Sequence, residues 1–155
     1  MASLSYDDIY SRVLDKITDY EFLDLTDSEI YENLTRKMKI ALSKPYLRRL
    51  FASVEYDDAV QVLTYELNYQ TSNSDADNDF VCEAIALGVI VAWLEPKVKT
   101  TNLIHQQFTS SKESKWYNQK DHLNELRALL KSCRYEQQSL IRDKGFINNA
   151  YVDGK

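Results

Sequence analysis

The sequence has few of the residues that force a chain to turn. Its 155 residues include only 3 glycines and 2 prolines. Short strands joined by tight hairpins need such residues at defined turn positions, so their scarcity argues against a fold of many hairpins. It also leaves no glycine-rich loop that could cradle a phosphate group. The composition therefore favours long, uninterrupted helices.

Cysteine and histidine are equally scarce, with two of each. Neither His105 nor His122 has a second histidine or a cysteine at metal-ligand spacing, which excludes a zinc pattern. Cys82 and Cys133 lie far apart in apolar helical patterns, which indicates buried thiols in a reducing cytoplasm rather than a disulfide framework. We therefore expect no metal, no cofactor and no catalytic residue, and hence no enzyme.

A long apolar run is also lacking. The longest, from Phe80 to Leu94, covers about 15 residues, whereas a helix needs about 20 to cross a bilayer. The first eight residues are acidic and contain no apolar stretch, so no signal peptide is expected. These two observations predict a protein without membrane association.

Charge is present but unevenly distributed. Residues 1–35 carry nine acids and two bases, residues 36–50 carry six bases and no acid, and residues 51–80 carry seven acids and no base. The formal net charge is −5, which argues against a grip on nucleic acid, because that binding depends on Lys and Arg. The basic stretch 36–50 could bind an acidic partner or pack against the acidic segments beside it.

Two N-terminal helices have clear boundaries in the sequence. Ser5 is placed to cap the first helix, in which Ile9, Val13 and Ile17 form one apolar stripe. Thr26 and Glu29 have the spacing of a capping box at the start of the second helix. Pro45 is expected to end that helix. Residues 46–56 fit either a short helix or an apolar strap.

The middle of the chain predicts two further helices separated by a polar loop at 69–78. Asp57 or Asp58 can cap the first of them, in which Val60, Leu63 and Leu67 continue the helical pattern. The second, residues 80–94, is apolar on nearly every face and is therefore expected to be the buried central helix. Asp77 or Asn78 would cap it, Gly88 would mark the close approach of another helix, and Pro96 would end it.

A long polar loop is expected at 97–114, followed by a last helix at 116–144. Leu123, Leu126, Leu130 and Cys133 form its apolar seam, and Gly145 is placed to end it. The predicted fold is thus all-α, a small helical bundle with a buried central helix and a long C-terminal helix. Residues 1–145 would form the bundle, and residues 146–155 would form an extended tail.

The surface, rather than a catalytic centre, carries the expected function. The tail is apolar, and it either folds back or docks on a partner; we expect docking through Phe146, Ile147, Asn148, Asn149, Tyr151 and Val152. Tyrosine is abundant at 11 residues and is enriched at protein interfaces, although tyrosines could also line the edge of the core. Contacts between subunits are expected at Tyr6 and Tyr10, and at Leu103 and Ile104 in the polar loop.

Several short motifs resemble the helical head–tail connector, or adaptor, proteins in the neck of tailed bacteriophages. They are spread over most of the chain, at residues 5–10, 43–51, 80–81, 86–88, 93–99, 115–119, 122–127 and 142–143, and at Tyr151. Two of the more distinctive are Ser-Lys-Pro-Tyr-Leu-Arg-Arg-Leu-Phe at 43–51 and Trp-Leu-Glu-Pro-Lys-Val-Lys at 93–99. Each motif is short, and none is as specific as a metal or phosphate motif.

This resemblance implies a structural virion protein that is assembled in the cytoplasm of the host bacterium. Such proteins are helical bundles that form a ring, dodecameric in this family, beneath the portal protein and extend the DNA channel toward the tail. The partners would be the portal protein, a tail-side neck protein (a head-closure or tail protein) and further copies of the chain. DNA would pass through the channel without specific binding. The alternative is a small acidic helical regulator that binds and inhibits a host protein.

Overall fold

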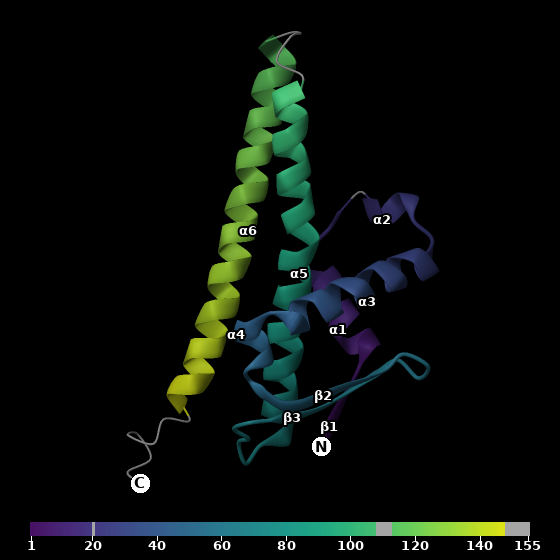
Figure 1. Ribbon diagram of the computed structural model, residues 1–155, viewed down its shortest axis with the longest axis vertical. Helices are drawn as coiled ribbons and strands as arrows, with labels where there is room; N and C mark the ends of the chain where they lie inside the picture. The colour runs from purple at the N-terminus through teal and green to yellow at the C-terminus, as the bar shows by residue number, and fades with distance from the viewer. Residues whose placement is uncertain (20, 108–112, 148–155) are drawn as a thin grey trace.

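Two long helices lying side by side set the shape of the molecule (Figure 1). The computed structural model describes residues 1–19, 21–107 and 113–147, and for 100–107, 113–122 and 145–147 it describes the backbone alone. The elements, in chain order, are β1 (Ala2–Ser5), α1 (Tyr6–Lys16), α2 (Glu21–Asp24), α3 (Asp27–Ser43), α4 (Pro45–Arg48), β2 (Phe51–Asp57), β3 (Val62–Leu67), α5 (Ser74–Gln107) and α6 (Glu113–Ile147).

The predicted all-α fold is wrong, because the described residues combine six helices with a three-stranded antiparallel sheet. The strand order is β1-β3-β2, so β3 lies in the middle. Tyr65 marks the register, since it pairs with Ala2 of β1 on one side and with Val54 of β2 on the other. The sheet lies at one end of the molecule, beside the first turns of α5 (Figure 1).

Residues 62–67 form a strand because their apolar residues alternate. Leu63, Tyr65 and Leu67 are buried, whereas the residues between them are more exposed, which is the period of a strand. Leu63 and Leu67 are also four residues apart, and this spacing produced the incorrect helix prediction. The hairpin turn depends on Asp57, whose side chain accepts hydrogen bonds from the backbone of Ala59 and Val60. Gln61, which follows this turn, has a φ of 56°, a backbone conformation that glycine usually supplies in hairpin turns.

The N-terminal helices follow the local rules of their sequence. The Ser5 side chain accepts a hydrogen bond from the Asp7 amide at 3.1 Å, which confirms Ser5 as the cap of α1. The Thr26–Glu29 capping box is present at the start of α3, and α3 ends at Ser43, two residues before Pro45. The undecided segment 46–56 contains the end of the short helix α4 and nearly all of β2.

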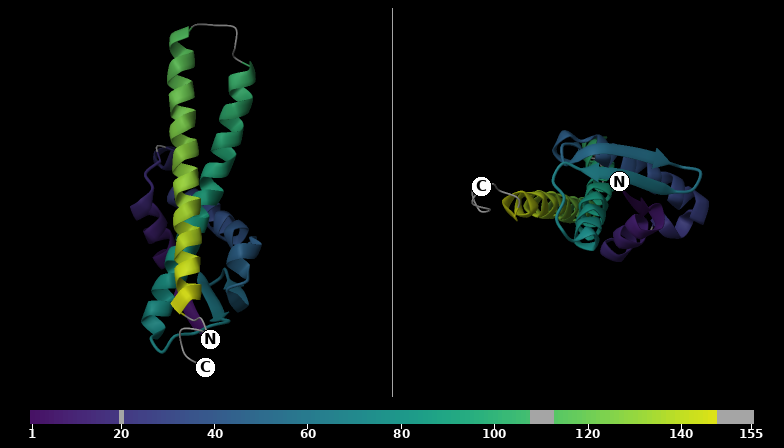
Figure 2. Two further views of the ribbon diagram at one scale, coloured as in Figure 1. Left: turned by 90° about the vertical axis from the view of Figure 1, so that its left-hand side faces the viewer. Right: turned by 90° about the horizontal axis from the view of Figure 1, so that it is seen from below.

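Helix α5 is longer at both ends than predicted. It begins at Ser74, where the Asn73 side chain accepts from the amides of Asp75 and Ala76, so the predicted caps Asp77 and Asn78 are wrong. It also continues past Pro96 to Gln107. A proline inside a helix costs about 3 kcal/mol, yet α5 continues through it, and beyond this point α5 and α6 draw apart toward the C-terminal end of α5 (Figure 2). Residues 81–94 are buried except Glu83, as predicted.

The predicted loop at 97–114 is therefore helical over most of its length, within α5 and from Glu113 in α6. Gly145 does not end the last helix, because α6 extends to Ile147. This moves the expected boundary between bundle and tail, since Phe146 and Ile147 belong to α6. The seam of α6 against the body includes the buried residues Leu123, Leu130 and Cys133.

Gly88 lies where three helices meet. A Cβ atom at this position would lie 3.0 Å from the Ala41 Cβ on α3 and 2.9 Å from the Gln137 Nε2 on α6. The Gln137 side chain is buried and donates from Nε2 to the Ala84 carbonyl of α5 at 3.0 Å. The prediction that Gly88 permits close approach of another helix is confirmed.

Candidate functional site

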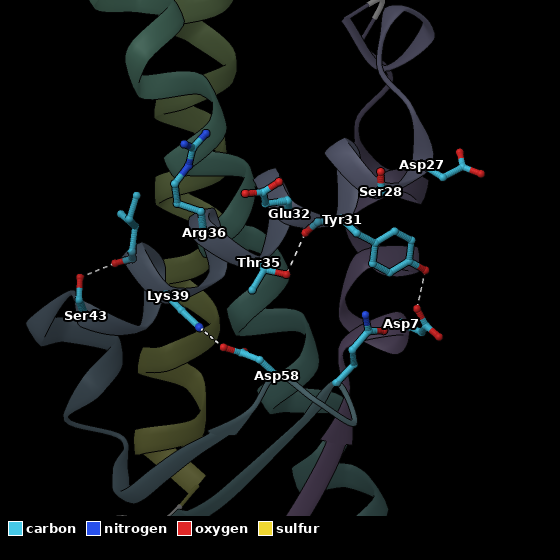
Figure 3. Close-up of a pocket in the computed structure, with 12 residues that line it drawn as sticks. Asp7, Asp27, Ser28, Tyr31, Glu32, Thr35, Arg36, Lys39, Ser43 and Asp58 are labelled. Atoms are coloured by element: carbon cyan, nitrogen blue, oxygen red, sulfur yellow. Dashed lines mark hydrogen bonds and ion pairs between the residues drawn. The ribbon is translucent and has the colours of Figure 1, made fainter.

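An open groove of about 1070 Å³ lies beside α3 (Figure 3). Its residues come from the first turn of α1, from the length of α3 and from the β2–β3 turn. Two pairs of its polar side chains contact each other. The Lys39 Nζ lies 2.6 Å from an Asp58 carboxylate oxygen, and the Tyr31 hydroxyl donates to Asp7 at 2.5 Å. These contacts hold α1, α3 and the hairpin together.

The groove does not assemble catalytic machinery from its described residues. Asp58 is exposed, and its pKa is lowered by hydrogen bonds from Lys39 and Tyr6. A general base at neutral pH needs a pKa near 7, which is the opposite direction. Across the described residues, no group of three His, Cys, Asp or Glu side chains could hold a metal ion.

Tyr6 and Tyr10, expected at a subunit interface, lie in the core of the chain. Each is only 1% exposed. The Tyr6 hydroxyl donates to Asp58 at 2.8 Å, and the Tyr10 hydroxyl lies 2.6 Å from the Thr35 hydroxyl. Burial raises the pKa of Tyr10 to about 12. These two tyrosines therefore pack α1 against α3 and the hairpin, and in this conformation they offer little surface to a second chain.

The other expected contact residues lie at the ends of the long helices. Leu103 and Ile104 belong to α5, and Phe146 and Ile147 belong to the last turn of α6, where only the backbone is described. The expected partner-binding residues Asn148, Asn149, Tyr151 and Val152 lie outside the described residues.

A buried ion pair fixes the last turns of α6 to the start of α5. The Lys144 ammonium contacts the Asp77 carboxylate and lies 4.7 Å from the centre of the Phe80 ring. Asp77 also accepts from the Thr71 amide at 2.8 Å and from its hydroxyl at 3.0 Å. Burial alone would raise the pKa of Asp77, but the bonds from Lys144 and Thr71 outweigh it and the pKa is lowered. This cluster sets where the chain leaves α6.

A second cluster anchors the segment before α2. The Asp19 carboxylate accepts from the Trp93 indole at 2.8 Å and contacts the Lys97 ammonium, while the Phe22 ring stacks on Trp93 at 4.8 Å. Burial would raise the pKa of Asp19, but hydrogen bonds from Lys97 and Trp93 lower it. Phe22 thus faces the body, and its neighbour Leu23 is left 79% exposed on α2.

The outer surface of α6 carries a different chemistry. Arg127, Lys131, Tyr135 and Arg142 are exposed and recur every four or seven residues, so they lie on one side of the helix. Tyr135 is 66% exposed at the centre of this group. The acids of this part of α6 are at positions 125, 136 and 143, and the Asp143 carboxylate lies 3.9 Å from the Arg142 guanidinium. We call Arg127, Lys131, Tyr135 and Arg142 the basic face of α6.

Sequence reasoning missed most of these residues. Asp77 and Lys144 are distant in sequence, and only tertiary packing brings them together. The sequence around Leu23 could have indicated an exposed apolar residue, since acids lie on both sides of it in a very short helix. Its exposure, however, depends on Phe22 facing inward. The two thiols lie where predicted, because Cys82 and Cys133 are buried and free.

Acid is expected to weaken the fold through Asp19 and Asp77. A carboxyl whose folded pKa is lowered stabilises the fold above its unfolded pKa of about 3.9 and loses that contribution as the pH falls through the folded value. The free energy of unfolding should therefore drop below about pH 4, measurable by urea denaturation at about pH 7 and about pH 3. The double variant Asp19→Asn/Asp77→Asn should be less stable at neutral pH and less sensitive to acid. An equally steep acid loss in this variant would contradict the assignment.

Among the described residues, the structure contains no helix that combines the length and the apolar character needed to span a membrane. Comparisons of the chain with protein-family models, with curated proteins and with solved structures found no match.

Proposed function

We propose that this protein is a structural subunit of the neck of a tailed bacteriophage, a connector that forms a ring beneath the portal and extends the DNA channel. The α5–α6 hairpin is the observation that carries the proposal. Its helices of 34 and 35 residues project well beyond the rest of the chain (Figure 1). In the projecting part the two helices have only each other as neighbours among the described elements. A helix pair of this kind is an element suited to packing against other subunits.

Two further observations support the proposal. The short motifs at 43–51 and 93–99 resemble those of phage connectors, and they lie at the α3–α4–β2 junction and around Pro96 of α5. The net charge of −5 suits a channel subunit, because a wall rich in Lys and Arg would retain DNA through its phosphates. The sheet is an addition to the helical bundle that the resemblance implies.

The test is assembly with the portal protein encoded in the same genome. The purified chain and that portal should form a complex with several copies of the chain, visible as a ring by electron microscopy and measurable by mass in analytical ultracentrifugation. A chain that stays monomeric beside the portal and forms no complex would contradict the connector proposal and favour the regulator.

Removing residues 148–155 is expected to abolish portal binding while leaving the fold intact. The removed segment follows α6, whose position is fixed by the Lys144–Asp77 pair, so every described element remains in the shortened chain. Far-UV circular dichroism and the urea midpoint should match those of the full chain. Full-strength portal binding by the shortened chain would show that this segment is not the portal contact.

A further inference from the structure

Two exposed surfaces of opposite charge lie on opposite sides of the molecule. One is the basic face of α6. The other, which we call the acidic end, consists of α2 and the first two turns of α3, residues 21–32. Figures 1 and 2 show α6 along one side of the body and α2 with the start of α3 projecting from the other.

The acidic end is negative throughout. Between residues 17 and 35 the chain has six acids and no Lys or Arg. Glu21 is within 3.1 Å of Lys97, and Glu29 belongs to the capping box, but the exposed carboxylates of Asp24 and Glu32 have no ion pair among the described residues. Leu23, at 79% exposure, projects from the centre of this acidic surface.

The basic face of α6 carries the opposite charge to the acidic end. Lys131 lies one helical turn before Tyr135, and Arg142 lies about two turns after it on the same side of the helix. Among the described residues, the polar contacts of Arg142 are with its own helix, at 3.5 Å to Ser139 and 3.9 Å to Asp143. Interfaces typically combine an apolar anchor with a charged rim, and Tyr and Arg are enriched in them.

We propose that the acidic end of one copy of the chain binds the basic face of α6 in the next copy. Two basic faces would repel each other, as would two acidic ends, so only the unlike pairing is electrostatically favoured. A contact between two different patches is head-to-tail, and when these patches lie on opposite sides of a subunit, repetition gives either a closed ring or an open filament. This inference deepens the proposed function, since it names the contact between subunits of the ring.

A reciprocal charge exchange tests the contact directly. One variant carries Asp24→Lys and Glu32→Lys, and the other carries Lys131→Glu and Arg142→Glu. Alone, each variant places like charges opposite each other at the exchanged positions of every contact, and its dissociation constant for self-association should rise by about tenfold or more. Mixed in equal amounts, the two variants can alternate, because each exchanged lysine then faces an exchanged glutamate. The mixture should therefore associate as strongly as the natural chain.

Sedimentation velocity from micromolar to near-millimolar concentration, at low and high salt, provides the readout. The natural chain should associate with rising concentration and dissociate as salt screens the charges. Matched controls reverse exposed charges outside both surfaces, Glu66→Lys and Arg49→Glu, and these should associate normally. Equal urea midpoints would show that all variants fold.

Three results would overturn the proposal: a natural chain that stays monomeric at low salt throughout this range, variants that associate as well as the natural chain, or a mixture no better than its components. Portal binding is measured separately. If the mixed variants associate but the natural chain does not bind the portal, the proposed neck function is contradicted and the proposed contact between subunits is supported. If one charge-reversed variant alone still forms a normal ring on the portal, the proposed contact between subunits is contradicted and the proposed neck function is supported.

Discussion

Replacing Lys144 with methionine is expected to lower the free energy of unfolding by about 3 kcal/mol. The substitution leaves the Asp77 carboxylate buried beside Phe80 without its cation, and the two side chains are only 13% and 9% exposed. An uncompensated buried charge is far more costly than a lost surface ion pair. Urea denaturation at neutral pH measures the change.

Lys131→Met is the matched control, because Lys131 lies on the same helix but is exposed. We expect it to change the free energy of unfolding by less than about 0.5 kcal/mol. Replacing the whole pair, by Asp77→Leu with Lys144→Met, should recover part of the loss, since no charge is then left buried. Equal midpoints for the two single methionine variants would refute the buried-pair interpretation.

Valine at position 88 is expected to destabilise the fold by about 3 kcal/mol, the upper range for overpacking a core. The Cβ atom would already crowd Ala41 at 3.0 Å, and the two methyl groups of valine would extend farther into the junction of α3, α5 and α6. Alanine adds only the Cβ atom and gains about 1 kcal/mol in helix propensity over glycine, so Gly88→Ala should cost clearly less.

The partner atom on α6 supplies an internal check on this junction. Shortening Gln137 to alanine removes the Nε2 atom that lies 2.9 Å from the position of a Cβ at residue 88. The cost of Gly88→Ala should therefore be smaller in a Gln137→Ala background, a coupling that a double-mutant cycle in urea measures. Strict additivity of the two substitutions would mean that residues 88 and 137 are not in contact.

The starts of α1 and α3 were predictable because their rules are local. Ser5 and the Thr26–Glu29 pair act through atoms two or three residues away, so the sequence alone contains both partners. The burial of residues 81–94 was predictable for a related reason. A helix that is apolar on every face must be covered on every side, whichever elements provide the cover.

The sheet was not predictable by the same reasoning. Leu63 and Leu67 suit a helix and a strand equally, and the residue that decides is Tyr65, which is buried between them. The turn used Gln61 at positive φ in place of glycine, so the usual hairpin signal was missing. Pro96 misled in the other direction, because the helix continues through this local helix breaker to Gln107.

The candidate surfaces depend on tertiary structure even more strongly. Tyr6 and Tyr10 were expected outside, and the hairpin and α3 cover them. The acidic segment around Leu23 was visible in the sequence, but its position opposite α6 follows from the path of the chain around α5. A charge pattern identifies what a surface could attract, whereas the fold decides which surfaces can meet.

The order of strands in the sheet also constrains how the chain is made. Strand β1 pairs with β3, so Ala2 needs Tyr65, which a ribosome adds much later. Until then α1 also lacks the hairpin that supplies the Asp58 partner of Tyr6 and the backbone contact from Tyr6 to Gln61. The β1–α1 segment can therefore make these native contacts only after the hairpin has emerged, and these long-range contacts favour slower folding than local ones.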